Sequence, residues 1–253
     1  MTDPAAHGIA ATLPEAALYD AAAARQRGVA DVPVYRALAL VVGEPVLELG
    51  AGTGRVLGPL VAAGVDATGL ELDPARISAG RARLDGLYGA GDRLVEGDLR
   101  SWRSPRPMGL IIAPYNVFNL LDDRDVDAAL AAARANLAPD GELAFEVQCW
   151  PDPTDPRSRW ELGPTPLTVR GQPATVREEV ERRGATRIRV ARHFEFTDGS
   201  SASVSVELRC RTLHDWLDLL AANRWALVTE PMDEHGRDHD PGSRLAIVRA
   251  RPG

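Results

Sequence analysis

The sequence predicts an α/β protein with a mostly parallel sheet, helices on both of its faces and an antiparallel β insertion after the fifth strand. Three observations lead to this prediction. An apolar run, Val46–Leu49, leads into a glycine-rich turn at residues 50–55. Short apolar strands then alternate with alanine-rich helical segments as far as residue 149, which is the pattern of a parallel sheet. Residues 174–211 change to the alternating pattern of antiparallel strands.

The composition is that of a globular chain with no basic surface. The 253 residues are 45% hydrophobic, enough for a full core, and the net charge is −7. An acidic chain without basic runs argues against nucleic acid or an anionic membrane as a partner. Cys149 and Cys210 are ordinary for a reducing compartment. With no leader pattern and no long apolar run, a cytoplasmic location is expected.

Two helices are expected before the glycine-rich turn. The first covers residues 14–27, with Pro14 in its first turn and Gly28 as its stop. The second is Val32–Val42, with Asp31 as its N-cap. Residues 1–12 are expected to form a loose tail.

The turn at residues 50–55 has the chemistry of a ligand-binding turn. Its glycines permit positive φ, and their missing Cβ atoms let a ligand approach the backbone. A dinucleotide-binding fingerprint would have its third glycine at Arg55, but here it is Gly54. Glu48, just before the turn, would repel a phosphate and attract a cationic amino-acid group. The alternative is an ordinary corner between a strand and a helix.

Three later strand ends also carry polar groups. Glu71 ends a strand at residues 66–72, about twenty residues beyond the turn, where a carboxylate suits a ribose diol. Asp98 follows a strand expected at residues 92–96, and the strand Met108–Ala113 leads into Tyr115 and Asn116. Taken alone, Glu71 could be a solvated carboxylate or a partner of a helix cap, and Gly-Asp is a common turn.

Taken together, the turn and these strand ends resemble the motifs of class I S-adenosylmethionine (SAM)-dependent methyltransferases. The turn fits their motif I, hydrophobic-Glu-x-Gly-x-Gly-x-Gly, and the likeness covers about residues 19–251. The pattern is closest to small-molecule N-methyltransferases of the sugar-amine and glycine type. The resemblance implies a Rossmann-like fold with a seven-stranded sheet, SAM as cofactor and S-adenosylhomocysteine (SAH) as product. It implies these cofactor-binding residues: Glu48, Gly50, Ala51, Gly52, Arg55, Glu71, Leu72, Asp98, Leu99 and Ala113.

The loop after the fourth strand points to a small-molecule acceptor. It reads Ala113-Pro114-Tyr115-Asn116 and lacks the polar residue that methyltransferases of nucleic-acid bases carry before the proline. Tyr19, Tyr115 and Asn116 are the expected catalytic residues, since an aromatic face stabilises a sulfonium and a side-chain oxygen can orient an amine. Tyr19 and Tyr35 lie where related proteins carry tyrosines of a lid, although either ring could simply be packed in the core.

A hydroxyl acceptor would require a general base. The candidates are His193, His214 and Glu146, and none stands out by its pattern, so methylation of nitrogen is favoured. His235 and His239 suggest a metal site, but no third ligand is placed by spacing, and a solvated loop is the better interpretation. No metal is therefore expected.

Three parts are expected: a helical lid (1–42), a SAM-binding domain (43–149 and 212–253) and an antiparallel cover (150–211). The cover has strands at residues 174–183, 185–197 and 201–211, and the proline-rich segment before them is interpreted as an irregular crossing. Its strands could pair across a homodimer. Two alternatives stay open: a SAM-binding protein that catalyses another reaction, such as cyclisation, or acts as a binding module; and an NAD-dependent oxidoreductase, which Arg55 disfavours.

Overall fold

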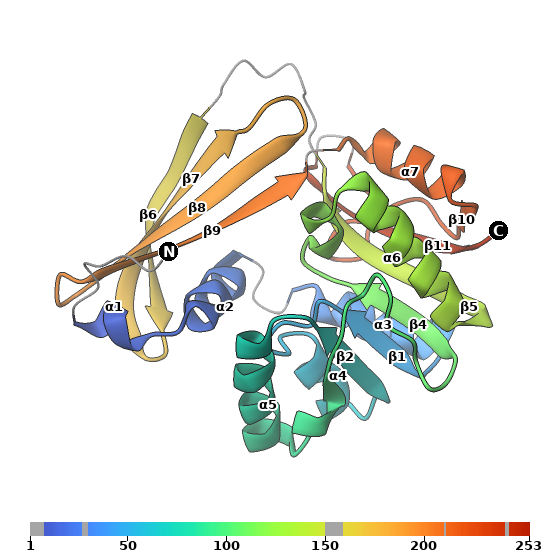
Figure 1. Ribbon diagram of the computed structural model, residues 1–253, viewed down its shortest axis with the longest axis horizontal. Coiled ribbons are helices and arrows are strands. Elements are labelled where there is room, and N and C mark those ends of the chain that lie inside the picture. Colours follow the sequence, from blue (N-terminus) through green and yellow to red (C-terminus); the bar gives the residue numbers. More distant parts are fainter. Residues whose placement is uncertain (1–7, 27–29, 150–158, 210, 241–242) are drawn as a thin grey trace. The chain divides into compact units, whose positions relative to one another are not determined.

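A computed structural model describes residues 8–26, 30–149, 159–209, 211–240 and 243–253 (Figure 1). Contacts divide the chain into two compact units. The first, here the cover unit, contains residues 1–28 and 153–209. The second, the Rossmann-like unit, contains residues 29–152 and 210–253.

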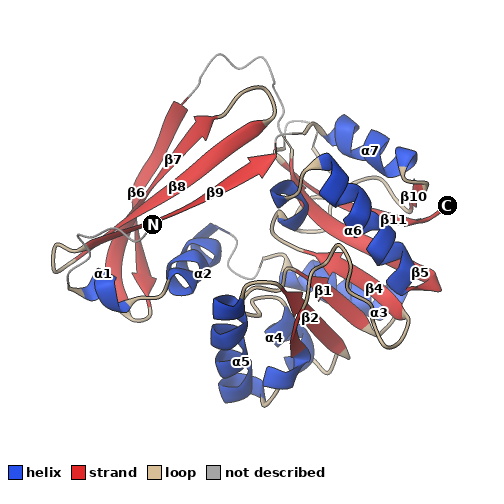
Figure 2. Cartoon of the chain, viewed as in Figure 1, coloured by secondary structure: helices blue, strands red, loops and turns tan. Residues whose placement is uncertain are grey.

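The Rossmann-like unit is built on a seven-stranded sheet of order β10-β11-β5-β4-β1-β2-β3 (Figure 2). Neighbouring strands from β1 to β5 are parallel, and β11 runs antiparallel to both β5 and β10. This confirms the predicted fold class. The strands are β1 (Val46–Leu49), β2 (Ala67–Glu71), β3 (Leu94–Glu96), β4 (Met108–Ala113), β5 (Leu137–Gln148), β10 (Trp225–Leu227) and β11 (Leu245–Pro252).

Helices begin at the capping residues that the sequence supplies. Asp73 accepts from the backbone N–H of Ala75, and Thr212 and Asp215 form a capping box. Asp31 is the N-cap residue of its helix, as expected, but its carboxylate makes no capping hydrogen bond. The helices are α3 (Val32–Val42), α4 (Leu57–Ala62), α5 (Pro74–Tyr88), η1 (Gly91–Arg93), η2 (Val117–Leu120), α6 (Asp123–Asn136) and α7 (Leu213–Ala222).

Successive side chains of the central strands point to opposite faces of the sheet, and each face has its own hydrophobic core. Leu47, Ile111 and Phe145 point to the face that packs with α6 and α7. Val46 and Leu110 point to the opposite face, where α3 and α4 cover them. By the same alternation, the carboxylates of β1 and β5 belong to the face under α3. The site described below is built on that face.

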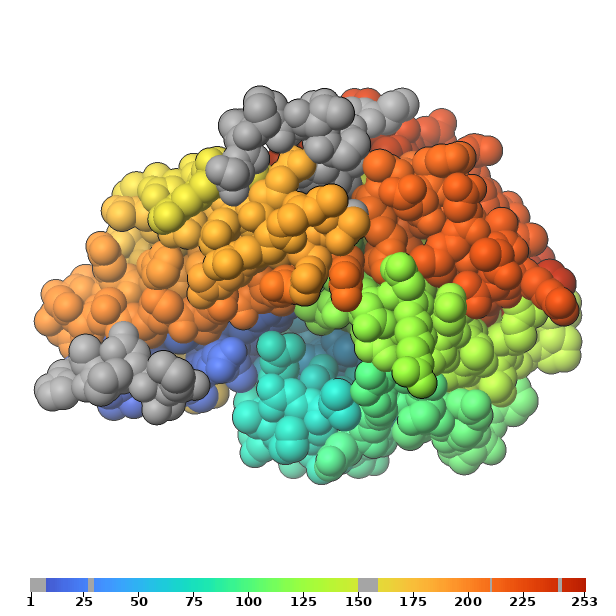
Figure 3. All heavy atoms as spheres, turned by 45° about the horizontal axis from the view of Figure 1, so that its top comes forward, coloured from blue at the N-terminus to red at the C-terminus, as the bar shows by residue number. Residues whose placement is uncertain are grey.

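The cover unit is a four-stranded antiparallel sheet, β6 (Arg159–Val169), β7 (Gln172–Arg182), β8 (Arg187–Phe196) and β9 (Ser201–Arg209), in sequence order. The atoms of these strands form the continuous yellow and orange surface in Figure 3. β6 corrects the prediction of an irregular segment up to residue 173. It is an edge strand, paired only with β7, so Pro164 and Pro166 remove no hydrogen bond from a central ladder.

Two helices, α1 (Ile9–Thr12) and α2 (Glu15–Gln26), belong to the cover unit and share a core with its sheet. The first corrects the expectation of a loose tail at these residues. The backbone N–H of Ile9 donates to Asp198 (2.7 Å), and that of Ala10 donates to Ser200 (3.0 Å). The expected lid at 1–42 is thus divided, since α3 packs on the parallel sheet. A lid function for either part stays a prediction, as does pairing of the cover across a homodimer.

Among the described residues, no helix is both long enough and apolar enough to cross a lipid bilayer.

We predict that Phe145→Ala destabilises the protein by about 3–5 kcal/mol, because the ring is fully buried and its removal leaves a cavity. The Phe145 ring centroid lies 4.8 Å from that of Phe118 and 6.0 Å from that of Trp216. Urea unfolding followed by circular dichroism measures the change. Leu40→Ala is the control, since Leu40 is 73% exposed and should cost under about 0.5 kcal/mol. Equal effects of the two changes would contradict this description of the core.

Candidate active site

The turn after β1 is joined to the end of β2 through one carboxylate. The backbone N–H of Gly52 donates to Oε2 of Glu71 (2.8 Å), and the backbone N–H of Asp73 donates to Oε1 (3.0 Å). Glu71 is only 6% exposed. Because the backbone holds both oxygens, the orientation of the carboxylate is fixed, and each oxygen keeps a lone pair for a ligand hydroxyl.

The glycines of the turn differ in what surrounds them. All three have positive φ. A Cβ on Gly50 would meet Val117 at 2.7 Å, and one on Gly54 would meet Leu84 at 2.9 Å, so these two permit close packing. A Cβ on Gly52 would have no described atom within 4 Å. Gly52 is therefore the position at which the backbone faces open space.

The apolar residues expected at the site occupy two kinds of environment. Leu72 follows β2 and is 58% exposed, an unusual exposure for a large apolar side chain beside a polar strand end. Leu99 is partly buried against the core. Ala51 and Ala113 are buried within the two cores, so only their backbone groups can serve a ligand.

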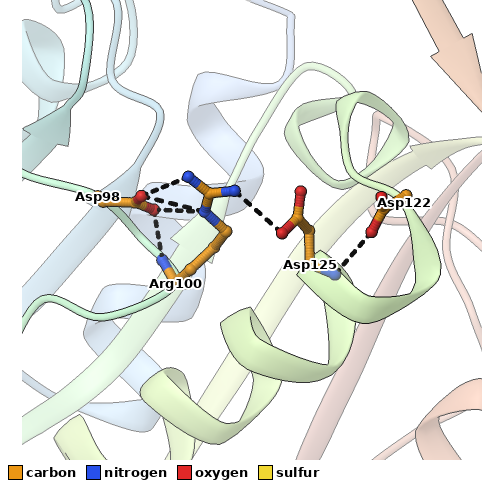
Figure 4. A network of polar contacts seen from close by, with 4 residues as sticks. All are labelled: Asp98, Arg100, Asp122 and Asp125. Carbon is orange, nitrogen blue, oxygen red and sulfur yellow. Dashed lines mark hydrogen bonds and ion pairs between the residues drawn. The ribbon is translucent and has the colours of Figure 1, made fainter.

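Asp98 has a partner that the sequence reasoning missed. Arg100 donates from Nε to both oxygens of Asp98 and from Nη2 to Oδ2 (2.6 Å), and from Nη1 to Asp125 (2.9 Å) (Figure 4). Asp125 in turn donates its backbone N–H to the capping residue Asp122. The hydrogen bonds from Arg100 lower the pKa of Asp98. The carboxylate is thus ionised and oriented, and its side chain stays 29% exposed.

A buried ion pair lies on the α3 side of the sheet. Arg55 donates from Nη1 and Nη2 to the two oxygens of Asp31 (2.6 and 2.7 Å), and the Asp31 side chain is fully buried. The guanidinium carbon of Arg55 lies 5.5 Å from the centroid of the Tyr115 ring, a cation–π distance. Arg55 therefore links the start of α3 to the loop after β4. Sequence reasoning had assigned Asp31 to a helix cap, and no local signal marked this long-range pair.

Glu48 lies in the same buried region. It accepts a hydrogen bond from the backbone of Leu57, and Oε2 has no hydrogen-bond partner among the residues that the structure describes. Burial raises the pKa of Glu48 to about 8, against the opposing effect of Arg55. The hydroxyl of Tyr35 is also buried without a described partner, and burial, together with Glu146 on β5, raises its pKa. We call these five residues, Asp31, Tyr35, Glu48, Arg55 and Glu146, the buried charge cluster.

The loop after β4 has a strained backbone. Tyr115 and Asn116 both adopt positive φ, 56° and 64°, a region that residues other than glycine rarely occupy. Reciprocal hydrogen bonds of 2.9 Å between Asn119 and the backbone of Gln148 hold the loop to the end of β5. Oδ1 of Asn116 is buried and accepts no hydrogen bond from the described residues. A strained loop presenting such an oxygen is typical of a functional site.

The remaining candidate catalytic residues lie on α2, α7, β5 and β8. Tyr19 lies on α2 of the cover unit and is partly buried. His193 is exposed on β8 and bonded to Ser203, whereas the His214 side chain is 82% exposed on α7. Glu146 is fully buried. The described residues contain no cluster of three or more potential metal ligands, His235 and His239 included.

The Rossmann-like unit also matches a known family. Residues 46–141 fit a family model described as a methyltransferase domain. This unit is a SAM-dependent methyltransferase domain of class I. The fold of the methyltransferase agrees with solved structures over most of its length. It matches the CcbJ methyltransferase of Streptomyces caelestis with a TM-score of 0.75 and 20% identity, over 89% of this chain and 90% of that one.

A second solved structure is described as SAM-bound CalS10, an amino pentose methyltransferase of Micromonospora echinaspora involved in calicheamicin biosynthesis. The TM-score is 0.68 and the identity 25%, over 92% of this chain and 95% of that one. A curated relative, the mycinamicin-resistance protein MyrB of Micromonospora griseorubida, is 47% identical over 55 residues. That match covers 22% of this chain and only 16% of the length of the relative.

The residues at the strand ends fit SAM. The open face of Gly52 leaves room beside the backbone, and Glu71 offers fixed acceptors. Leu72 offers an apolar surface, and Oε2 of Glu48, which has no partner in the described part of the chain, suits a cationic donor. The two carboxylates are acceptors for the hydroxyls and the amino group of the cofactor, and Leu72 is an apolar surface for its aromatic ring.

We predict that Glu48 makes stability depend on pH. A carboxyl whose folded pKa is raised from 4.5 to about 8 binds a proton in the folded state that the unfolded state has lost. Stability should therefore fall as pH rises from about 5 to about 8, with a slope of roughly 1 kcal/mol per pH unit from this group. Urea unfolding between pH 5 and pH 9 measures the slope. Glu48→Gln, which stays neutral, should remove it, and an unchanged slope in that variant would contradict the assignment.

Proposed function

We propose that this methyltransferase transfers the methyl group of SAM to an amine nitrogen of a small molecule, such as an amino sugar or another amine of secondary metabolism. The single observation that carries the choice of nitrogen is the buried Oδ1 of Asn116, after the end of β4, which accepts no hydrogen bond from the residues that the structure describes. An N–H or an O–H could donate to such an oxygen, but an amide oxygen does not remove a proton, so an amine held there is nucleophilic and a hydroxyl is not. The description of CalS10 as an amino pentose methyltransferase supports the same acceptor class.

We assign the cofactor to the strand ends of the Rossmann-like unit. Glu71 would accept from the ribose hydroxyls, Asp98 from the adenine amino group, and Leu72 and Leu99 would contact the adenine ring. Glu48 would meet the amino group of the methionine moiety, which supplies the missing partner of its Oε2. Gly50 and Gly52 let the backbone come close, while Ala51 and Ala113 would contribute backbone groups only.

Bound SAM supplies an electrophilic methyl group on a sulfonium. The protein's task is to align the acceptor with that methyl group and to exclude water, which supplies a large part of the acceleration in such reactions. Asn116 would orient the amine through its N–H, so that the nitrogen lone pair points at the methyl group. Tyr115, which is held against Arg55, would present its ring to the positive charge.

Arg55 acts here as a positioning residue. Nη1 and Nη2 of Arg55 donate to Asp31, and the guanidinium lies over the Tyr115 ring. Arg55 would thereby fix the strained loop that carries Asn116. Tyr19, on α2 of the cover unit, stays a proposed catalytic residue.

An amine is also the acceptor that needs the least base chemistry. A neutral amine already carries its lone pair, whereas a hydroxyl needs a base to remove its proton. Of the three candidate bases, His193 and His214 are exposed. Glu146 is fully buried beside Tyr35. None of these environments is that of a base presented to a substrate.

The test is a screen of amine and alcohol acceptors with SAM, in which SAH formation and the mass of the product are both measured. We predict turnover with at least one amine and a fall in kcat/KM of about tenfold to a hundredfold in Asn116→Gly. Glycine tolerates the positive φ, so this variant removes the side chain without backbone strain.

Asn116→Asp is the matched control, because aspartate keeps an oxygen at the same place and tolerates the same backbone conformation. It should retain most of the activity on the amine. Turnover of alcohols alone would contradict the choice of nitrogen. Binding of SAM without turnover of any acceptor would favour a binding module or a non-methylating reaction.

A further inference from the structure

One ion pair interrupts the apolar face of the cover sheet. On this face β7 presents Val176 and Val180, and β8 presents Val190 and Phe194, all buried. Glu178 and Arg192 have the same alternation and are direct neighbours across the two strands. The Arg192 side chain is 8% exposed and that of Glu178 is 15% exposed.

The ion pair is oriented by one residue of α2. Nε of Arg192 donates to Oε2 of Glu178 (2.8 Å), and Nε2 of Gln26 donates to the same oxygen (3.2 Å). Nη2 of Arg192 donates to Oε1 of Gln26 (3.3 Å). Nη1 of Arg192 and Oε1 of Glu178 make no hydrogen bond to any described residue. A fixed donor and a fixed acceptor therefore remain available side by side.

These groups line a cavity of about 530 Å³ that is formed by α2, β6, β7 and β8 of the cover unit. Its wall also contains apolar side chains, Ala22, Leu162 and Val176, and the hydroxyl-bearing Thr165. Leu162 is 54% exposed although it pairs with Glu178 across the strands. The ladder between β6 and β7 shifts register between Leu162 and Thr165, next to this part of the wall.

The stability of the sheet does not account for the ion pair. A buried ion pair gains little over well-packed apolar residues of similar volume, because desolvation offsets the attraction of the charges. The neighbouring positions of this face on β7 and β8 are apolar and buried. Its presence at a cavity is better explained by a ligand that uses the two available groups.

The charges define the class of this ligand. Glu178 and Arg192 neutralise each other, so neither an anion nor a cation can use both of the available groups of the pair, and Arg25 is the other charged residue of the lining. A neutral ring with several hydroxyls satisfies both polar groups, since each hydroxyl donates and accepts. The C–H faces of such a ring suit the apolar wall.

We propose that this cavity binds a sugar ring, with Nη1 of Arg192 donating to one ring hydroxyl and Oε1 of Glu178 accepting from another. This binding does not depend on the proposed function.

The experiment measures saturation-transfer NMR between the full-length protein and methyl α-D-glucopyranoside, with inorganic phosphate as an anionic competitor. We expect saturation transfer to the sugar that phosphate does not displace. In the double variant Glu178→Leu/Arg192→Met, the dissociation constant for the sugar should rise at least about tenfold. This variant replaces the whole pair with apolar residues, so it should fold with a melting temperature close to that of the wild type.

Glu207→Gln is the matched control. Glu207 pairs with Arg187 across β8 and β9 at 2.9 Å, but on the exposed face of the same sheet, with side chains about half exposed. This variant should bind the sugar as the wild type does. No saturation transfer in the wild type, displacement by phosphate, or unchanged affinity in the folded double variant would each overturn the inference.

Calorimetric titration of SAM into the same proteins separates this inference from the proposed function. We expect SAM to bind the wild type and both variants equally. A wild type that binds the sugar but not SAM would contradict the proposed function and support the cavity. A double variant that loses the sugar and keeps SAM would support the inference.

Discussion

The hydrogen bond from the backbone of Gly52 to Glu71 is the constraint on which the site depends. It ties the turn after β1 to the end of β2, and it requires a glycine backbone that no side chain covers. The parallel order of the strands then brings the ends of β3 and β4 to the same edge. The acids of β2 and of the turn after β3 are held in fixed orientations, Glu71 by backbone N–H groups and Asp98 by Arg100.

The buried charge cluster is the second feature of the site. Asp31 and Arg55 are engaged with each other, so their charges cost the fold little, whereas Glu48 is left with one oxygen that nothing described satisfies. An unsatisfied buried carboxylate is unfavourable for the protein alone. Its presence next to a glycine turn is understandable if a bound cationic group supplies the missing partner. At Glu48, the unpaired oxygen that favours binding of a cation therefore lowers the stability of the protein without its ligand.

Much of the fold could be predicted because it is encoded locally. The apolar strands, the caps and the glycine turn each lie within a few residues, and the order of the strand-end acids follows from them. Side-chain partners leave no such signal. Arg100 is only two residues from Asp98, but nothing in the sequence shows that its side chain turns back toward that carboxylate. Asp31 is predicted to be a helix cap because its partner, Arg55, is distant in the sequence. β6 was missed because its prolines are acceptable only at a sheet edge, and edge position is a property of the whole sheet.

The most direct measurement is calorimetric titration of SAM and SAH into the wild type, Glu71→Gln and Glu96→Gln. Glu96 lies opposite Glu71 in the register of β2 and β3 but is exposed, which makes it a matched control. We predict binding by the wild type, unchanged binding by Glu96→Gln and a loss of roughly 1–3 kcal/mol in Glu71→Gln, which replaces one acceptor oxygen with a donor and leaves a buried N–H without its partner. Failure of the wild type to bind either ligand, or equal binding by all three proteins, would contradict this account of the site.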